Sequence, residues 1–295
     1  MPQTRTTGLL LLLLTAIIWG ATWPILKFLL TEMPPLSMRA LGTALVATGL
    51  ALAALVFRIP LHVPREQRGR LVLFGLLNIT AWMAFGTLAL RWLTASEGAI
   101  IAYTMPVWAA LFAWPILRER PGPARIVGLL LGVGSIGVLF AGKGASLGLE
   151  KLPGLLLILA SAVLFALGAV LSKRRPLVLH PITSLAWQMA VGCVPMAILA
   201  PLLETFEPRL VSAPVWLAFG GFMLCSMVVS YLTWFGALAR LPASTAALGT
   251  LLAPVLSVLG AAHFLGEPLG LREALALTAT LAAVALAVAS RDKPR

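Results

Sequence analysis

The amino-acid sequence predicts an all-α integral membrane protein with ten transmembrane helices, arranged as two inverted repeats of five helices. Hydrophobic residues make up 60% of the 295-residue chain and charged residues only 11%, and the mean hydropathy is +0.99. These values lie far outside the range of soluble domains. Ten apolar stretches of about 20 residues could each cross a hydrocarbon core about 30 Å thick. One segment of the first half also recurs in the second half.

The recurring segment joins Ala89–Arg120 to Ala237–Pro268, 148 positions later, with twelve of 32 aligned residues identical. The identical pairs include Ala95/Ala243, Ser96/Ser244, Pro106/Pro254, Val107/Val255 and Glu119/Glu267. Because each copy would contain an odd number of spans, the second copy must be upside down relative to the first. Inverted symmetry of this kind is typical of alternating-access carriers. The sequence therefore predicts transport of a small-molecule substrate across the lipid bilayer.

The predicted spans follow one another with short connections, none of which could house a soluble catalytic domain. The spans are Leu9–Leu30, Pro35–Phe57, Leu71–Trp92, Ala95–Leu117, Ala124–Ala141, Pro153–Ser172, Ile182–Leu203, Pro214–Ala239, Ala243–Leu265 and Leu271–Ser290. The first resembles a signal peptide, but no cleavage site of the Ala-x-Ala type follows it, so we interpret it as a helix. The polar stretch Gly142–Leu152 separates the two halves. This division predicts one repeat over residues 1–142, a linker over 143–152 and a second repeat over 153–295.

Lysine and arginine residues are distributed unevenly between the two sides that these spans define. With the N-terminus inside, fifteen fall on the inner side and seven on the outer side. The inner residues are Arg5, Arg58, Arg65, Arg68, Arg70, Arg118, Arg120, Arg125, Lys173, Arg174, Arg175, Arg240, Arg291, Lys293 and Arg295, and the outer ones are Lys27, Arg39, Arg91, Lys143, Lys151, Arg209 and Arg272. Cytoplasmic loops carry such an excess. We therefore predict that both termini are cytoplasmic and that the net charge of +12 reflects topology, with no nucleic-acid partner.

Spans four and nine share the features most suggestive of a site. Ser96 and Ser244 lie at their starts, where a hydroxyl can cap the helix by accepting a bond from a free backbone N–H. Pro106 and Pro254 lie near their centres, where each would remove a backbone hydrogen bond and kink the helix. Kinked helices at matching places in inverted repeats point to a midplane binding site. A packing kink without a ligand is the alternative.

Spans five and ten carry small residues at matching positions. These are Gly128, Gly132, Gly134, Ser135 and Gly137 in span five, opposite Ala276, Thr280, Ala282, Ala283 and Ala285 in span ten. Small residues allow close backbone approach between helices in lipid. We interpret these faces as scaffold of a monomer, with a dimer surface as the alternative.

Aromatic residues gather at the predicted membrane midplane. Tryptophan usually prefers the membrane interface, yet two tryptophans lie in the middle of their spans, with other large side chains at similar depth. Asn78, four residues before Trp82 on the same helical face, could orient a polar group or bond a neighbouring helix. Packing of the aromatic rings is the alternative to a lined cavity. The predicted substrate-binding residues are Trp19, Asn78, Trp82, Tyr103, Met105, Pro106, Phe165, Trp234 and Pro254.

Charged and catalytic groups are not found at this depth in the sequence. Every carboxylate falls in a loop or near a helix end, and Glu97 is interpreted as complementing a helix dipole. Arg39 is interpreted as a snorkelling or structural residue near the outer boundary of span two. A neutral, aromatic cavity favours substrates with an apolar body and a net charge of zero or slightly positive. No catalytic grouping, metal-spaced cluster or cofactor motif is found, so we predict no enzyme, no cofactor and no metal.

Several motifs resemble the EamA family of the drug/metabolite transporter superfamily. They are Trp19-Gly20-Ala21-Thr22 followed by Lys27, Pro34-Pro35 with Arg39, Tyr103-Thr104-Met105-Pro106 ending in Arg118-Glu119-Arg120, and Pro254 with Gly266-Glu267-Pro268. The resemblance covers both repeats and implies a basket-like fold, with a cavity lined by spans one, three, four, six, eight and nine. It also implies export across a bacterial inner membrane, with the 143–152 linker in the periplasm.

Within that family the chain is similar to the YddG-type exporters of amino acids. This similarity implies cavity positions at Trp82, Tyr103, Met105, Pro106 and Phe165. Met105 and Phe165 stand where tryptophans are expected in such exporters, which favours a wider substrate range. We therefore expect export of neutral and aromatic amino acids and related amphipathic metabolites by alternating access. An exporter of drugs or quaternary cations, and a non-transporting receptor or scaffold, are the alternatives.

Overall fold

The structure is a computed structural model that describes residues 2–118, 123–140, 145–238, 240–241 and 249–289. These residues form helices and connecting turns and contain no strand, which confirms the all-α prediction. The first half contains α1 (Pro2–Leu29), α2 (Pro35–Val56), α3 (Arg65–Phe74), η1 (Gly75–Phe85), α4 (Gly86–Ala89), α5 (Ala95–Ala102), α6 (Met105–Leu117) and α7 (Pro123–Phe140). The second half contains α8 (Ala145–Arg174), α9 (Pro181–Leu203), η2 (Pro208–Leu210), α10 (Ala213–Leu224), η3 (Cys225–Val229), α11 (Ser230–Leu238), α13 (Leu252–Leu265) and α14 (Leu271–Ala289).

Within the described residues, six helical stretches are long and apolar enough to cross a membrane by length and composition. They are Arg5–Leu29, Pro35–Val56, Arg65–Ala89, Ala95–Leu117, Leu149–Arg174 and Pro181–Leu203, and the shorter apolar helices are Ile126–Leu139, Ala213–Leu224 and Leu252–Leu265. Large apolar side chains are exposed on the outside of the bundle, such as Leu55, Ile198 and Leu217. A belt of this kind is stable only against lipid or another apolar surface. The fold is that of a membrane protein, and the full number of ten spans stays a prediction.

Helix α8 begins earlier than the sequence predicts. Residues 145–152, which were expected in the linker, form its first two turns. Lys151 of this extension donates to the Glu97 carboxylate at 2.6 Å. This ion pair ties the start of α8 to α5.

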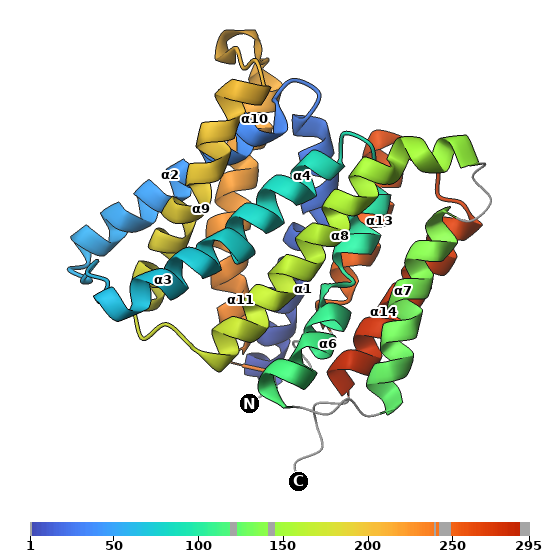
Figure 1. Cartoon of the computed structure of the whole chain (residues 1–295), viewed down its shortest axis with the longest axis horizontal. Coiled ribbons are helices and arrows are strands. Elements are labelled where there is room, and N and C mark those ends of the chain that lie inside the picture. Colours follow the sequence, from blue (N-terminus) through green and yellow to red (C-terminus); the bar gives the residue numbers. More distant parts are fainter. Residues whose placement is uncertain (1, 119–122, 141–144, 239, 242–248, 290–295) are drawn as a thin grey trace.

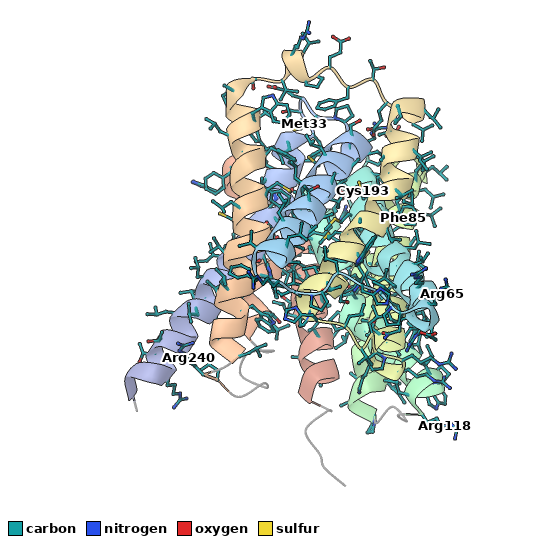
Figure 2. The ribbon with its side chains drawn as sticks, turned by 90° about the vertical axis from the view of Figure 1, so that its left-hand side faces the viewer. Met33, Arg65, Phe85, Arg118, Cys193 and Arg240 are labelled. Atoms are coloured by element: carbon teal, nitrogen blue, oxygen red, sulfur yellow. The ribbon has the colours of Figure 1, made fainter. Side chains whose placement is uncertain are left out.

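The two ends of the molecule differ in charge. Helix α1 begins and α14 ends at the same end of the bundle (Figure 1). Arg118 and Arg240 lie towards this end, called the basic end below, whereas Met33 lies towards the other, called the Met33 end (Figure 2). Gathering of arginines at one end is what the predicted topology requires. The membrane side that each end faces stays a prediction.

Helices from the two halves of the chain alternate in the bundle. Helix α1 packs between α11 and α13, and α8 packs against η1 and α6. Helices α2 and α9 form a further pair across the halves, as do α7 and α14 (Figure 1). Each half is therefore packed mainly against elements of the other half.

Glycines set the distance between η1 and α9. A Cβ added at Gly192 would lie 2.5 Å from Cβ of Ile79 and 3.0 Å from the Gly75 carbonyl oxygen. A Cβ at Gly75 would lie 3.1 Å from the Gln188 carbonyl oxygen. Thr80 fixes the contact by donating to the Gly192 carbonyl at 2.8 Å. The absence of these two side chains allows the backbones to approach.

The small-residue faces of α7 and α14 pack against each other, as the scaffold interpretation expects. The Thr280 hydroxyl donates to the Ser135 hydroxyl at 2.9 Å, and both side chains are buried. A Cβ at Gly128 would lie 3.0 Å from the Ala283 carbonyl oxygen. Gly128 and Ser135 thus serve packing within one chain, whereas a Cβ at Gly134 or Gly137 would meet nothing within 4 Å, so scaffold and a dimer surface both stay open.

At the Met33 end, glutamates from connecting segments cap helices of the other half. Glu267, after α13, accepts bonds from the backbone N–H groups of Ala95 and Ser96 at 2.6 and 3.0 Å. Glu204, after α9, accepts from Leu36 and Ser37 at the start of α2 at 3.0 and 2.8 Å. Carboxylates at helix N-termini satisfy free N–H groups and complement the helix dipole.

A third carboxylate repeats the arrangement at α10. Glu32, after α1, accepts from the Ser212 backbone N–H and from its hydroxyl at 2.5 and 2.8 Å. Each of the three glutamates also receives a serine hydroxyl, because Ser37 and Ser96 donate in the same way at 2.9 and 2.7 Å. The two halves are thus joined at this end by charge-assisted hydrogen bonds.

The start of α5 corrects one prediction about capping. Thr94, not Ser96, is the N-cap, and its side chain accepts from the Glu97 N–H while Glu97 accepts from the Thr94 N–H. Ser96 lies two residues further along, in the first turn of α5, where its hydroxyl donates to Glu267. The sequence did not show that a carboxylate 171 residues away would supply the acceptor. Ser244 and Glu119, the repeat partners of this pair, lie outside the described residues.

Replacing Gly192 with alanine should destabilise the protein by roughly 1–3 kcal/mol, because the added methyl group would overlap Ile79 and force α9 away from η1. Loss of helical circular dichroism on heating the purified protein in detergent measures the effect. Gly220→Ala in α10 is the matched control, since a Cβ there meets nothing within 4 Å. Equal unfolding temperatures for the two variants would contradict the assigned contact.

Replacing Glu267 with alanine should cost roughly 1–3 kcal/mol, because the N–H groups of Ala95 and Ser96 would lose their acceptor. The same thermal unfolding measurement applies. Glu150→Ala, at an exposed position of α8, removes the same charge without a cap and should change stability by less than about 0.5 kcal/mol. A Glu267 variant as stable as the Glu150 variant would contradict the cap that Glu267 is assigned at the start of α5.

Candidate functional site

Aromatic rings from both halves of the chain meet along α1. Trp82 of η1 lies between Trp23 of α1 and Phe165 of α8, with ring centroids 6.5 and 4.8 Å away. Trp19, one helical turn before Trp23, pairs with Trp234 of α11 at 5.4 Å. These separations and the tilted or edge-on geometries are typical of favourable aromatic pairs. The rings form two neighbouring groups along α1, Trp23–Trp82–Phe165 and Trp19–Trp234, which are a candidate surface for an apolar or aromatic ligand.

Buried hydroxyl groups fix α1 beside its neighbours at this level. Thr15 and Thr233 are hydrogen-bonded through their hydroxyls at 2.8 Å, which joins α1 to α11. Ser257 of α13 donates to the Gly20 carbonyl at 2.6 Å. A Cβ at Gly20 would lie only 2.5 Å from Cβ of Leu256 on α13. The position of Trp19 therefore follows from a close contact that only glycine permits.

A second hydroxyl plays the corresponding role on α8. Ser161 is fully buried and donates to the Trp82 carbonyl at 3.1 Å. Ser161 follows Thr15 by 146 positions, the same offset that relates Trp19 to Phe165. Thr15 thus links α1 to α11, and Ser161 links α8 to η1. In both cases the first helix of one half is bonded to the third predicted span of the other half.

Both of those third stretches contain π-helical turns. η1 covers Gly75–Phe85 and includes Asn78 and Trp82, and η3 covers Cys225–Val229 just before Trp234. When η1 is shifted by 148 positions, it overlaps η3. π-Helical turns are uncommon and often occur at functional sites. Trp82 lies on π-helical backbone beside α1, whereas Trp234 lies in the regular helix α11, which follows η3.

The helix of span four is interrupted before its proline, and in span nine a turn directly precedes the helix that carries the matching proline. α5 ends at Ala102, a turn follows at Tyr103–Thr104, and α6 begins at Met105. A turn at Thr250–Leu251 likewise precedes α13. Pro106 and Pro254 therefore lie in the first turn of a new helix, where a missing N–H costs nothing. The expected mid-helix kink is replaced by a break, which suits a binding site at least as well.

Helices α6 and α13 also end alike. Arg118 ends α6 with φ 60° and Gly266 ends α13 with φ 66°, 148 positions apart. This left-handed conformation is common where a helix stops, and glycine adopts it without strain. It turns the chain so that Glu267 reaches the start of α5.

Tyr103 connects the break in span four to the aromatic rings. Its hydroxyl lies 3.5 Å from the Trp19 carbonyl oxygen, a long hydrogen bond. Next to it, the Trp108 indole N–H donates to the Thr104 hydroxyl at 3.1 Å. Tyr103 therefore presents a polar group beside Trp19.

Asn78 does not join the aromatic group. Its amide nitrogen lies 3.5 Å from the Gln188 side-chain oxygen on α9, and Gln188 donates to Ser184 at 3.0 Å. A Cβ at Gly168 of α8 would lie 2.1 Å from its oxygen, and that oxygen is buried with no hydrogen-bond partner. The helix-bonding interpretation of Asn78 is favoured over a role in orienting a ligand.

The structure thus brings together five of the nine predicted site residues: Trp19, Trp82, Tyr103, Phe165 and Trp234. Met105 and Pro106 are half-buried at the start of α6. Pro254 is buried on α13, beside Ala253, whose carbonyl approaches Gly20. The sequence analysis missed Trp23, although its spacing of four residues from Trp19 places both on one face of α1.

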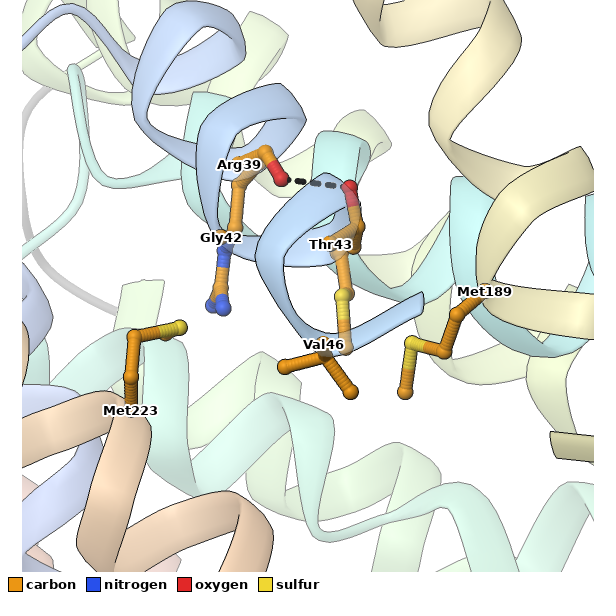
Figure 3. A pocket seen from close by; sticks show the side chains of 7 residues that line it. Arg39, Gly42, Thr43, Val46, Met189 and Met223 are labelled. Carbon is orange, nitrogen blue, oxygen red and sulfur yellow. Dashed lines mark hydrogen bonds between the residues drawn. The ribbon is translucent and has the colours of Figure 1, made fainter. Parts of the chain in front are cut away.

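Arg39 is buried between helices and does not snorkel to an interface. Only 8% of the residue is exposed, and its Nε donates to the Thr87 hydroxyl of α4 at 2.6 Å. Its guanidinium lies 5.7 Å from the centre of the Phe222 ring on α10. Of the two interpretations of Arg39, snorkelling was wrong, because neighbouring helices cover α2 at this position, and a structural residue fits its bond to Thr87. A small cavity adjoins the side chain (Figure 3).

Another cavity, of about 480 Å³, opens at the Met33 end. It is lined by residues of the α1–α2 connection together with Lys27, Leu90 and Arg91. The Lys27 ammonium donates to the carbonyls of Leu90 and Leu93, the latter at 2.9 Å. These bonds cap the end of α4 with a positive charge, as helix C-termini favour.

Among the described residues, no group of three or more histidine, cysteine, aspartate or glutamate side chains could hold a metal ion. Cys193 and Cys225 are free thiols in the structure. The Cys193 thiol donates to the Ala40 carbonyl at 3.3 Å, which fits a helix contact between α9 and α2.

Comparison with known proteins places this architecture. The family model described as "EamA-like transporter family" matches twice, over residues 6–141 and 152–289. The uncharacterized transporter YvbV of Bacillus subtilis is 31% identical over 92% of this chain and 87% of that protein. The aromatic amino acid exporter YddG of Ancylobacter novellus is 28% identical, covering 97% of this chain and 96% of that protein.

Two further comparisons agree with these. A probable amino-acid metabolite efflux pump of Salmonella typhimurium is 24% identical over 88% of this chain and 87% of that protein. A solved crystal structure with 22% sequence identity superimposes with a TM-score of 0.65, covering 98% of this chain and all of the other. The likeness to the crystal structure concerns the fold alone.

Proposed function

The chain belongs to the EamA-like transporter family, and from this we propose that it exports neutral amino acids and related amphipathic metabolites, aromatic ones included. Transport is supported by the family and by the names of its relatives, two of which refer to amino acids. The choice of amino acids as the substrate class depends on the aromatic residues of the candidate site. We infer a multi-pass protein of a bacterial inner membrane with both termini in the cytoplasm.

The observation that carries the proposal is the group of rings shared by both halves. Trp19, Trp23 and Trp82 come from the first half, whereas Phe165 and Trp234 come from the second. Rings can cover an apolar side chain and hold an ammonium group over a ring face. A site assembled from both halves would change shape whenever one half moved relative to the other.

The proposed mechanism is alternating access between two inverted repeats, residues 1–142 and 153–295, comprising ten spans. The double family match, the shared offset of η1 and η3, and the paired helix breaks support this division. Turns before α6 and α13 would act as hinges beside the rings, because interrupted helices can bend with little loss of hydrogen bonding. Rocking about the site would expose it first to one end and then to the other.

Transport without proton coupling is part of the proposal. Glu97 is the carboxylate nearest to membrane depth, and it is engaged with Lys151 and in capping α5. Proton-coupled carriers usually hold an ionisable carboxylate within the membrane. We therefore expect facilitated exchange down the substrate gradient. Substrate flux that requires an imposed pH gradient would contradict this.

An exporter of drugs or quaternary cations is the second candidate. The same aromatic rings favour it, since a quaternary ammonium binds well between ring faces. The two candidates differ in whether the substrate needs a carboxylate. Uptake of a labelled choline-like cation with no uptake of amino acids would favour this second candidate.

Trp82→Ala and Tyr103→Ala should each lower the uptake of labelled Phe, Trp, Met and Thr into proteoliposomes of purified protein. Losing one ring contact costs roughly 0.5–2 kcal/mol, which corresponds to a decrease of about two- to thirtyfold. Trp114→Ala is the matched control, because Trp114 is 51% exposed on the outside of α6. Its uptake should stay within about twofold of the original.

Three outcomes separate the candidates. Loss of uptake in the Trp82 and Tyr103 variants, with normal thermal unfolding, would support transport through this site. Normal uptake in both variants would move the site elsewhere. Binding of amino acids without any flux in the unaltered protein would favour a receptor or scaffold.

A further inference from the structure

We propose that Arg39 and the cavity beside it hold the carboxylate group of the transported substrate, an inference that rests on the proposed export of amino acids. Together with the aromatic rings, Arg39 would recognise a zwitterion at its two ends. The proposal assigns a role to a charged residue that the sequence analysis treated as structural.

The charge of Arg39 has no counter-ion within the part of the chain that the structure describes. None of the described carboxylates lies within 4 Å of its guanidinium, although the residue is only 8% exposed. Burying a charge at membrane depth is costly unless it is paired. An anion that visits the site during transport would supply the missing partner.

Most of the donors of the guanidinium are also unused. Its Nε–H is taken by the Thr87 hydroxyl at 2.6 Å. The hydrogen bonds of the described residues include no acceptor for its terminal nitrogens, which bear the other four N–H donors and face the adjoining cavity. Phe222 provides a ring 5.7 Å away, which stabilises the cation but accepts no strong hydrogen bond. The planar fork of arginine is suited to binding a carboxylate through two parallel bonds.

The adjoining cavity sets the size of the group that fits. Its volume is about 10 Å³, close to the space that one water molecule needs. Its lining apart from Arg39 consists of Gly42, Thr43, Val46, Met83, Met189 and Met223. The guanidinium extends past Gly42 towards the side of Met223 (Figure 3). The proposal places one oxygen of the substrate carboxylate in this space, beside the guanidinium.

Gly42 keeps the space beside the guanidinium open. A Cβ at this position would lie 2.9 Å from the sulfur of Met223. The Thr43 hydroxyl already donates to the Arg39 carbonyl at 2.7 Å (Figure 3). It therefore competes little with a ligand for the Arg39 guanidinium. The remaining wall is formed by methionines, which adapt their shape easily.

The cavity and the aromatic rings share one helical segment. Met83 lines the cavity, and Trp82 is the residue that precedes it in η1. The proposal places the carboxylate of a zwitterion at Arg39 and its ammonium or ring at Trp82. A substrate without a carboxylate would leave Arg39 unpaired and so would bind less well.

The test compares labelled phenylalanine with phenethylamine, which has the same ring and ammonium but no carboxylate, in proteoliposomes. The unaltered protein should prefer phenylalanine by roughly tenfold to a hundredfold, because a charge-assisted hydrogen bond contributes about 1.5–3 kcal/mol. Arg39→Gln should lower phenylalanine uptake by a similar factor and leave phenethylamine within about twofold. The preference should then disappear.

Thr87→Val separates binding from a structural role. It removes the acceptor of Arg39 Nε and leaves the charge, so the preference for phenylalanine should persist. If Arg39→Gln and Thr87→Val both lowered the two uptakes equally, Arg39 would be only a structural contact and the inference would fail. An Arg39→Gln variant that kept the preference would also overturn it.

Two further outcomes identify the anion that binds at Arg39 and distinguish failure of this inference from failure of the proposed export. If phenylalanine uptake required chloride and showed no preference over phenethylamine, the site would belong to a free inorganic anion and the inference would fail. If the unaltered protein transported no amino acid, the proposed export would fail, and binding would decide the role of Arg39. Phenylacetate should then quench tryptophan fluorescence in the unaltered protein and not in Arg39→Gln, and equal quenching would overturn the inference.

Discussion

The hydrogen bond from Ser257 to the Gly20 carbonyl holds α13 against α1 where Leu256 would leave no room for a side chain. In lipid, helices gain little from hydrophobic association, so close packing and buried hydrogen bonds must fix their positions. The Thr15–Thr233 bond supplies the second such contact on the same helix. Because α1 carries Trp19 and Trp23, the placement of both aromatic groups follows from these contacts with the other half of the chain.

The two ends of the bundle are held by different chemistry. Three glutamates cap helices across the halves at the Met33 end, each bonded to a backbone N–H and a serine hydroxyl. At the basic end, described bonds join α3 to the α8–α9 connection: Gln67 exchanges neutral hydrogen bonds with the Val178 backbone, and the Arg70 guanidinium donates to the Pro176 carbonyl at 3.1 Å. Charge-assisted bonds are the stronger kind. If the halves rock as proposed, opening the Met33 end would break more charge-assisted bonds than opening the basic end. Water would have to replace the lost partners.

Much of this architecture follows from sequence patterns, because apolar length and internal repetition report directly on what lipid requires. The helix of span two has nearly the predicted ends, and Trp82 contacts Phe165, which was predicted to lie at a similar depth. Side-chain direction did not follow. Asn78 and Trp82 share a helical face only in a regular α-helix, and the π-helical turns of η1 alter that spacing. The cap from Glu267 to Ser96 depends on contacts between distant segments, which one sequence does not specify.

The burial of Arg39 changes which substrates suit the site. Rings alone favour a cation, and a neutral cavity of this kind would accept drugs and amines as readily as amino acids. A buried guanidinium without a described counter-ion repels a second positive charge in a medium of low dielectric constant. A zwitterion avoids that cost, since its carboxylate can meet the guanidinium while its ammonium stays over a ring. On this argument the electrostatics favour amino acids over quaternary cations, even though the aromatic lining is compatible with both.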